Sequence, residues 1–184
     1  GALASVAFVL KAFDGDGQED IVWQNEATRE LAVWFLKQTN YVTSGRLPND
    51  ISVGWRIVAV ADFNRDSHPD LLWRSPSSGD NEIWLMNGTK RIARESLPSS
   101  FAGFEIAGAG DFNGDGNPDI LWRDANRNLT VAWFMEGITW TGGVGFISGE
   151  PDFRWNLATI GDFNNDGDTD LFWRDRYTGA NFIW

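Results

Sequence analysis

The sequence predicts an all-β protein built from four tandem repeats, and two series of residues carry this prediction. The first is an acidic stretch that occurs four times without a gap, with final aspartates at Asp20, Asp70, Asp119 and Asp170. These aspartates are 50, 49 and 51 residues apart. The second series is tryptophan, which stands three residues after each aspartate and again eleven residues later. Self-similarity at a period of about 50 residues within one chain indicates a repeat architecture.

Within a repeat the pattern is β throughout. In the second repeat the apolar runs RIVAVADF, DLLWRS and NEIWLM are rich in branched and aromatic residues, and turn clusters such as SPSSGDN separate them. A looser fourth segment, RIARESLP, closes the repeat. Three or four strands in roughly 50 residues are typical of a β-propeller blade, whereas a helical solenoid needs a 3.6-residue period. We therefore predict one propeller-type repeat domain over 1–184, with blades at approximately 1–50, 51–99, 100–150 and 151–184.

The two ends of the chain need separate interpretation. The opening GALASVAFVL is as apolar as the centre of a signal peptide but lacks a basic start, and residues 3–11 align with 53–61. We therefore expect it to form the first strand of the first blade. At the other end, Trp184 follows the third strand of the fourth repeat, so we expect that blade to lack its outer segment. Three interpretations stay open: a piece of a longer propeller, an open arc, or a part completed by a second copy as a homo-oligomer.

Composition excludes several function classes. The chain is 42% hydrophobic with 11 Trp and 13 Phe, enough for a substantial core, and ten of the eleven tryptophans sit at repeat positions. Its formal net charge of -11 argues against nucleic acid or an anionic membrane as partner. It has no cysteine for disulfides or thiolate metal sites, and a single histidine, His68. No apolar run reaches the roughly 18 residues of a membrane span, so we expect no membrane insertion.

The acidic stretches have the composition of calcium loops. Calcium binds six to eight oxygens at ~2.3–2.6 Å, and a tight loop can supply side chains from positions 1, 3, 5 and 9 and a carbonyl from position 7. The predicted side-chain ligands are Asp14, Asp16 and Asp20; Asp62, Asn64, Asp66 and Asp70; Asp111, Asn113, Asp115 and Asp119; and Asp162, Asn164, Asp166 and Asp170. The predicted carbonyl ligands are those of Gln18, His68, Asn117 and Asp168.

The four loops differ in quality. The first has Ala12 at position 1, and the second has Ser67 where a glycine would allow the turn and Arg65 beside the site. We therefore expect up to four Ca²⁺ ions, bound most strongly in the third and fourth repeats. An EF-hand would need a glutamate at position 12, which is Trp122 in the third loop. Turns rich in Asx residues without metal are the alternative, and the recurrence of three carboxylates per loop argues against it.

Charge supports the metal interpretation. The loops hold twelve ligand-position aspartates out of 26 acidic residues, and clustered carboxylates repel each other unless a cation lies between them. Four Ca²⁺ ions would bring the formal charge from -11 to -3. Magnesium fits less well because it holds its waters and demands strict octahedral geometry.

The motif D-x-N-x-D-x-x-x-D followed by I/L-L-W-R and W-x-M-N-G resembles the FG-GAP/VCBS repeat family, the calcium-loop blades of integrin-α-like β-propellers. The resemblance covers essentially the whole chain. It implies calcium at Asp111, Asn113, Asp115 and Asp119 and at the equivalent positions of the other repeats, and an extracellular or cell-surface location. Family members include lectins, adhesins and accessory domains of secreted enzymes, so the family does not fix the function.

Three matching positions suggest a ligand surface. Counted from the second tryptophan of each repeat, Tyr41, Arg91 and Trp140 align, and a ring or guanidinium there could stack on a sugar; solvated hairpin decoration is the alternative. We expect a carbohydrate-binding, lectin-like module with a glycan as partner, or alternatively a protein-interaction or adhesion propeller that binds a surface protein and in which calcium is purely structural. We expect no catalytic residues, because the acids outside the loops are scattered singly.

Overall fold

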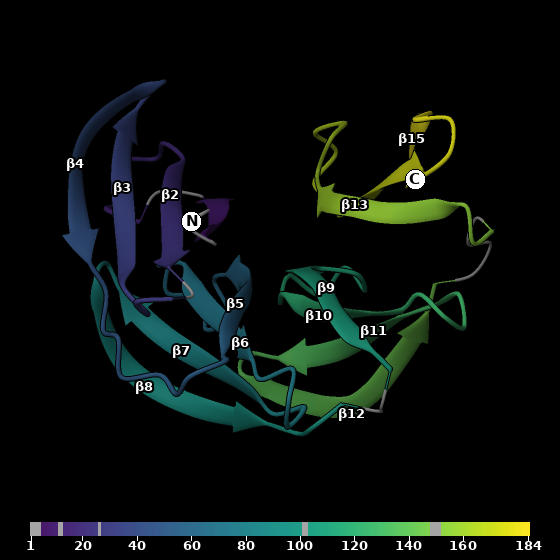
Figure 1. The fold of residues 1–184 in the computed structure, drawn as a ribbon, viewed down its shortest axis with the longest axis horizontal. Coiled ribbons are helices and arrows are strands. Elements are labelled where there is room, and N and C mark those ends of the chain that lie inside the picture. The colour runs from purple at the N-terminus through teal and green to yellow at the C-terminus, as the bar shows by residue number, and fades with distance from the viewer. Residues whose placement is uncertain (1–4, 11–12, 26, 101–102, 148–151) are drawn as a thin grey trace. The chain divides into compact units, whose positions relative to one another are not determined.

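The computed structural model describes residues 5–10, 13–25, 27–100, 103–147 and 152–184, and for 5–10 the backbone alone. All regular elements in these residues are β-strands, arranged in antiparallel sheets whose strands follow one another in chain order (Figure 1). The predicted all-β fold of blade-like repeats is confirmed. The described part of the chain contains no helix able to cross a membrane.

The chain divides into two compact units, Gly1–Ser99 and Ser100–Trp184, and each holds two sheets. The first sheet of the first unit consists of β1 (Ser5–Leu10), β2 (Asp20–Asn25), β3 (Leu31–Lys37) and β4 (Asn40–Arg46). The second sheet consists of β5 (Arg56–Ala61), β6 (Asp70–Arg74), β7 (Asn81–Asn87) and β8 (Lys90–Leu97). Because β1 pairs with β2 from Ser5↔Asn25 to Leu10↔Asp20, the expected first strand at the amino terminus is confirmed.

The second unit repeats this pattern. Its first sheet consists of β9 (Glu105–Gly110), β10 (Asp119–Asp124), β11 (Leu129–Glu136) and β12 (Thr139–Phe146). Its second sheet consists of β13 (Trp155–Gly161), β14 (Asp170–Asp175) and β15 (Asn181–Ile183). The fourth sheet thus has three strands in the described residues, as the sequence predicts.

The core of the first unit lies between its two sheets. Val22 and Val33 of the first sheet belong to one buried cluster with Leu71, Trp73 and Trp84 of the second. Burial of apolar side chains of this size contributes roughly 1.5–3 kcal/mol each. A polar link crosses the same boundary: the buried Gln24 side chain accepts a hydrogen bond from Ile57 N at 2.9 Å and donates one to Trp55 O at 2.7 Å. The two blades are therefore joined by apolar packing and by one fully paired amide.

The second unit is packed by the same kind of contact. Leu121 and Ala132 of the third sheet cluster with Leu171 and Trp173 of the fourth, and the Arg123 guanidinium lies 5.3 Å from the centre of the Trp173 ring. Within each of the first three sheets the two repeat tryptophans also contact each other, with ring centres 4.7–4.8 Å apart. The fourth sheet substitutes Phe182, whose ring is 6.4 Å from that of Trp173.

Two glycines of β9 allow the third and fourth sheets to approach closely. A Cβ atom placed on Gly108 would lie 2.4 Å from Ile160 Cδ1, and one placed on Gly110 would lie 2.6 Å from Thr169 Oγ1. Neither glycine has a positive φ, so the requirement is for space and not for backbone freedom. These positions are filled by Ala59 and Ala61 in the second repeat, so the sequence alone does not mark them as glycine-dependent.

We predict that Gly108→Ala destabilises the second unit by ~1–3 kcal/mol, because the added methyl group overpacks the contact with Ile160. Chemical denaturation monitored by tryptophan fluorescence measures the effect. Ile160→Ala removes the clashing atoms, so the double variant should cost less than the sum of the two single variants by about 1 kcal/mol or more. Strict additivity of the two substitutions would contradict the close contact.

Candidate functional site

The four acidic loops share one backbone conformation. Each joins the first and second strands of its sheet, and each has left-handed φ values at loop positions 4 and 6, counted from position 1 as in Asp62, Asp111 and Asp162. The φ values are 81° and 81° at Gly15 and Gly17, 60° and 70° at Arg65 and Ser67, 78° and 81° at Gly114 and Gly116, and 62° and 95° at Asn165 and Gly167. The second loop therefore keeps the glycine conformation without glycine. Ala12, at position 1 of the first loop, lies outside the described residues.

In the third loop the side chains at positions 1, 3 and 5 turn their oxygens towards the loop backbone. Asp111 Oδ1 accepts a hydrogen bond from Gly114 N and Asp111 Oδ2 accepts one from Gly116 N, both at 2.7 Å. Asn113 Oδ1 accepts one from Asp115 N at 2.9 Å. Asp115 Oδ1 accepts one from Asn117 N at 2.7 Å. Three oxygen-bearing side chains thus converge on one turn.

The other loops repeat this arrangement. Position 1 accepts a bond from the backbone N–H of position 6 in the second and fourth loops, at 2.8 Å for Asp62 and 3.0 Å for Asp162. The asparagines at position 3, Asn64 and Asn164, accept from the backbone N–H of position 5 at 3.1 and 2.9 Å. The carboxylates at position 5 accept from the N–H of position 7; these pairs are Asp16 with Gln18, Asp66 with His68, and Asp166 with Asp168.

The aspartate at position 9 has a different environment. Asp20, Asp70 and Asp119 are fully buried, whereas the described side chains at positions 1, 3 and 5 are partly or fully exposed. One oxygen of each buried aspartate accepts a hydrogen bond from the phenylalanine at loop position 2, and the other accepts one from the third strand sixteen residues on. For Asp119 the donors are Phe112 N at 3.0 Å and Met135 N at 2.9 Å.

The fourth loop has half of this arrangement. Asp170 is partly buried and accepts a hydrogen bond from Phe163 N at 2.9 Å. The residue sixteen positions beyond it would follow Trp184. The sequence identified position 9 as a ligand but missed its second role. The recurrence of Phe13, Phe63, Phe112 and Phe163 at position 2 was the available signal.

Burial and neighbouring charge both act on these carboxyl groups. Burial raises the pKa of Asp70 to about 6, against the two backbone N–H donors that lower it. Burial also raises the pKa of Asp119, and the nearby carboxylates of Asp115 and Asp111 add to the increase. The acidic side chains of the third loop are therefore close enough to repel each other.

The predicted ligands differ in how closely the structure brings them together. Positions 1, 3 and 5 converge, while position 9 lies at the buried base of the loop. In the described part of the chain no three Asp, Glu, His or Cys side chains form a compact metal cluster. The donor set of the loops includes asparagine and backbone oxygens as well, which suits a hard cation with many oxygen ligands. The role of the carbonyls of Gln18, His68, Asn117 and Asp168 stays a prediction.

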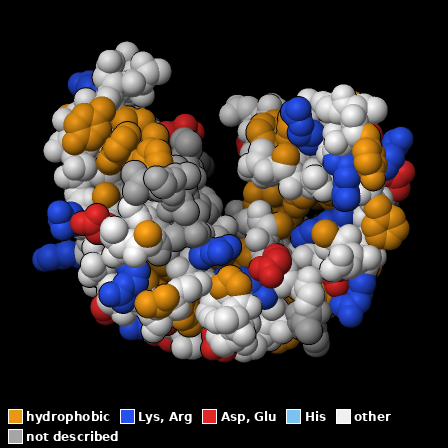
Figure 2. All heavy atoms as spheres, viewed as in Figure 1, with side chains coloured by type: hydrophobic (Ala, Val, Ile, Leu, Met, Phe, Trp, Pro, Cys, Tyr) orange, Lys and Arg blue, Asp and Glu red, His pale blue; other side chains and the backbone are white. Residues whose placement is uncertain are grey.

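The aligned residues Tyr41, Arg91 and Trp140 each contact the second tryptophan of their own repeat. Tyr41 meets Trp34 edge to face with ring centres 5.6 Å apart, and Trp140 stacks on Trp133 at 4.5 Å. Trp34 and Tyr41 are 41% and 56% exposed, and hydrophobic side chains gather over β3 and β4 in Figure 2. The first repeat therefore presents an open pair of rings.

In the second repeat the corresponding cation is held by the protein. The Arg91 guanidinium lies 4.4 Å from the Trp84 ring centre, and its Nη2 donates to Asp50 Oδ2 at 2.8 Å. In the third repeat Trp140 is partly buried, and its indole Nε1 donates to Gly143 O at 3.0 Å, which fixes the ring orientation. Tyr41 and Trp140 are thus the two aromatic members of the series.

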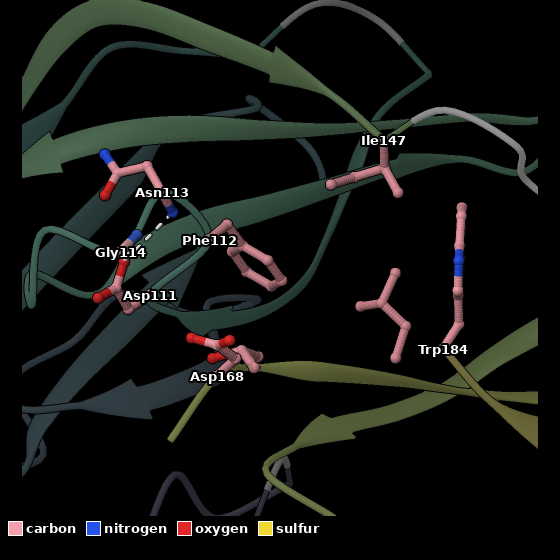
Figure 3. Close-up of a pocket in the computed structure, with 9 residues that line it drawn as sticks. Asp111, Phe112, Asn113, Gly114, Ile147, Asp168 and Trp184 are labelled. Carbon is pink, nitrogen blue, oxygen red and sulfur yellow. Dashed lines mark hydrogen bonds between the residues drawn. The ribbon is translucent and has the colours of Figure 1, made fainter. Parts of the chain in front are cut away.

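A hollow of about 450 Å³ lies beside the third and fourth loops. Figure 3 shows Asp111 and Asn113 on one side of it, Asp168 below, and Ile147 and Trp184 opposite. Its lining combines loop oxygens with the apolar side chains of Phe112, Ile147, Leu171 and Trp184. The candidate metal loops thus border a space that has both polar and apolar walls.

Comparison with known proteins gives one family match. The model of the FG-GAP-like repeat matches residues 13–73, 62–122 and 111–173. No curated protein matches the chain. Among solved structures, a protein of unknown function from Bacteroides caccae is similar at 15% identity and a TM-score of 0.36. The match covers 96% of this chain and 56% of that one, so this chain spans about half the length of its structural relative.

The left-handed φ at Ser67 generates a prediction. A non-glycine residue in this conformation is strained by ~1–2 kcal/mol, and glycine loses part of that gain by being more flexible when unfolded. We expect Ser67→Gly to stabilise the first unit by about 0.5–1 kcal/mol, measured by chemical denaturation.

The reciprocal change is Gly167→Ser, at the same position of the fourth loop, where φ is 95° and an added Cβ meets nothing within 4 Å. It should destabilise the second unit through backbone strain alone. Ser96→Gly in the exposed part of β8 is the control and should destabilise. A stabilising effect of both serine-to-glycine changes would show that the loop conformation is not the cause.

Proposed function

The chain belongs to the FG-GAP-like repeat family, and on that basis we propose that it is a calcium-binding β-propeller repeat protein that acts as a carbohydrate-binding module. The observation that carries the calcium part is the four-fold loop backbone. It brings the oxygens of positions 1, 3 and 5 together although the residues at positions 4 and 6 differ. The proposal includes no catalytic step.

The loop residues fit a calcium ion in chemistry and in charge. Carboxylate, amide and carbonyl oxygens are the ligands calcium prefers, and a carboxylate oxygen that accepts one backbone N–H still has a lone pair for a metal. Bound calcium would neutralise the repulsion that Asp111 and Asp115 exert on Asp119. The second and third loops couple this charge to a fully buried aspartate, so metal binding there would stabilise the blade as well as the loop.

Exposed loops of this kind suit an environment rich in calcium. The side chains at positions 1, 3 and 5 of the described loops keep contact with solvent, and weak exposed calcium sites of extracellular modules fill only at ~10⁻⁴–10⁻³ M. We therefore place the protein outside the cell or at the cell surface.

The aromatic series supports the carbohydrate part. Tyr41 and Trp140 each extend the second tryptophan of a repeat into a two-ring surface, and such surfaces pack against the apolar faces of sugars while nearby polar groups select hydroxyls. Two sites of this type on one chain would bind a repetitive glycan with gain from multivalency. Arg91 is committed to Trp84 and Asp50, so we assign sugar contacts to the two aromatic members.

A second candidate is a protein-interaction or adhesion module in which calcium only stabilises the loops. It is favoured by the apolar side chains exposed on the fourth blade, where Phe163 is 45% and Ile183 50% exposed. Chelator-sensitive stability without binding to any glycan would favour this candidate over the first.

The calcium proposal predicts a metal-dependent melting temperature. Calcium at about 100 times its dissociation constant contributes ~2.7 kcal/mol per site, which corresponds to ~5–10 °C for a chain of this size. Removal of calcium with a chelator should lower the melting temperature accordingly. Asp115→Asn should lower the calcium content, measured by mass spectrometry of the dialysed protein, by one ion per chain. Glu95→Gln, an exposed acid on β8, is the control. Dialysed protein that retains no calcium and does not respond to it would refute the proposal.

The carbohydrate proposal predicts that Trp140→Ala weakens binding to any glycan identified on an array by at least about tenfold, equivalent to 1.4 kcal/mol. Tyr41→Ala should weaken it as well, because it removes the equivalent ring. Tyr177→Ala is the matched control, since Tyr177 is 75% exposed but lies in the turn before β15, away from the series. Equal effects of all three substitutions, or no glycan bound at high protein concentration, would count against this function.

A further inference from the structure

Neighbouring blades in each unit pack through one fixed pair of faces. We call the residues Phe13, Val22 and Val33, and their equivalents in later repeats, the leading face; it packs on Leu71, Trp73 and Trp84 of the next blade. We call the latter residues and their equivalents the tryptophan face. In the second unit the leading face of the third blade packs on the tryptophan face of the fourth, with Leu121 and Ala132 against Leu171 and Trp173. The same rule therefore holds in both units.

Strand register defines these faces without reference to burial. Val22 pairs with Val33, Leu121 with Ala132, and Phe172 with Ile183, so Phe172 and Ile183 are the leading-face residues of the fourth blade. On the opposite side of the strands, Leu71 pairs with Trp84 and Ile21 pairs with Trp34. Ile21 and Trp34 are therefore the tryptophan face of the first blade.

The leading face of the fourth blade is uncovered. Phe163 and Ile183 are 45% and 50% exposed, whereas their equivalents Phe13 and Val33 in the first blade are fully buried. The Phe163 ring lies 5.8 Å from that of Phe172, so the exposed side chains form one continuous apolar area. No charged side chain replaces these residues, as would be expected if the face were adapted to water.

The tryptophan face of the first blade is open as well. Trp34 is 41% exposed and Ile21 and Trp23 are only partly buried, while Leu71, Trp73 and Trp84 of the second blade are fully buried by the first. The chain thus presents one uncovered face of each type, and these are the two types that pack together inside it.

We propose that the leading face of the fourth blade binds the tryptophan face of the first blade of a second copy of this chain. Phe163, Phe172 and Ile183 of one copy would cover Ile21, Trp23 and Trp34 of the other, in the way that Phe13, Val22 and Val33 cover Leu71, Trp73 and Trp84. Burial of exposed apolar side chains drives the association, with no requirement for calcium or glycan. The contact is head to tail, so each copy uses two different surfaces.

The head-to-tail geometry makes the experiment specific. Ile183→Asp places a charge on the leading face and Trp34→Lys places one on the tryptophan face, and each variant keeps the other face intact. Sedimentation velocity and native mass spectrometry should show that the unmodified chain self-associates with rising concentration, while each variant alone is at least about tenfold weaker. A mixture of the two variants should form dimers, because each supplies the face that the other lacks.

The mixture also excludes misfolding as the cause, since unfolded variants could not restore each other. Tyr177→Asp, on an equally exposed aromatic outside both faces, should associate like the unmodified chain. An unmodified chain that stays monomeric would overturn the proposal. So would a mixture that stays monomeric, or a Tyr177→Asp variant that is as impaired as Ile183→Asp.

Discussion

One buried carboxylate in each repeat fixes the loop, the strands and the site together. In the second and third repeats, both oxygens of Asp70 and Asp119 are occupied by backbone N–H donors, one from the loop and one from the third strand. A buried carboxylate without partners would be strongly unfavourable, so these two donors must be in place for the blade to fold. The carboxylate therefore sets where the loop leaves the sheet and how the third strand lies beside it.

The same bond also orients the contact between blades. The loop donor is the backbone N–H of a phenylalanine, and in the first and third repeats the side chains of Phe13 and Phe112 pack into the cluster shared with the next blade. The oxygens of loop positions 1, 3 and 5 lie on the solvent side of the same turn. A cation bound there would act on the loop charge and, through the buried aspartate, on strand pairing and blade packing. Loop binding and blade stability are linked by geometry of a few residues.

How far the sequence predicts this structure depends on the range of each interaction. The repeats, the strands and the place of the amino terminus followed from local patterns, namely tryptophan spacing, branched apolar runs and turn clusters. The contacts that the sequence did not predict join distant residues: Asp119 with Met135 N, Arg91 with Asp50, and Gly108 with Ile160. Position 6 of the loops is an intermediate case. The pattern required glycine there, and Ser67 adopts the glycine conformation nonetheless because the rest of the loop imposes it.

Ligand identity and structural support rank the loops differently. By sequence the third and fourth loops are equal, since each has aspartate or asparagine at positions 1, 3, 5 and 9. The structure separates them, because Asp119 is fully buried with two donors whereas Asp170 is partly buried and has the one from Phe163. In a repeat array the stability of each unit is the sum of its own folding and its contacts with neighbours. The fourth blade has one uncovered face and three strands, so its loop has the weaker support. The third loop alone combines a complete donor set with a fully supported base, and calcium bound there would be coupled most strongly to the fold.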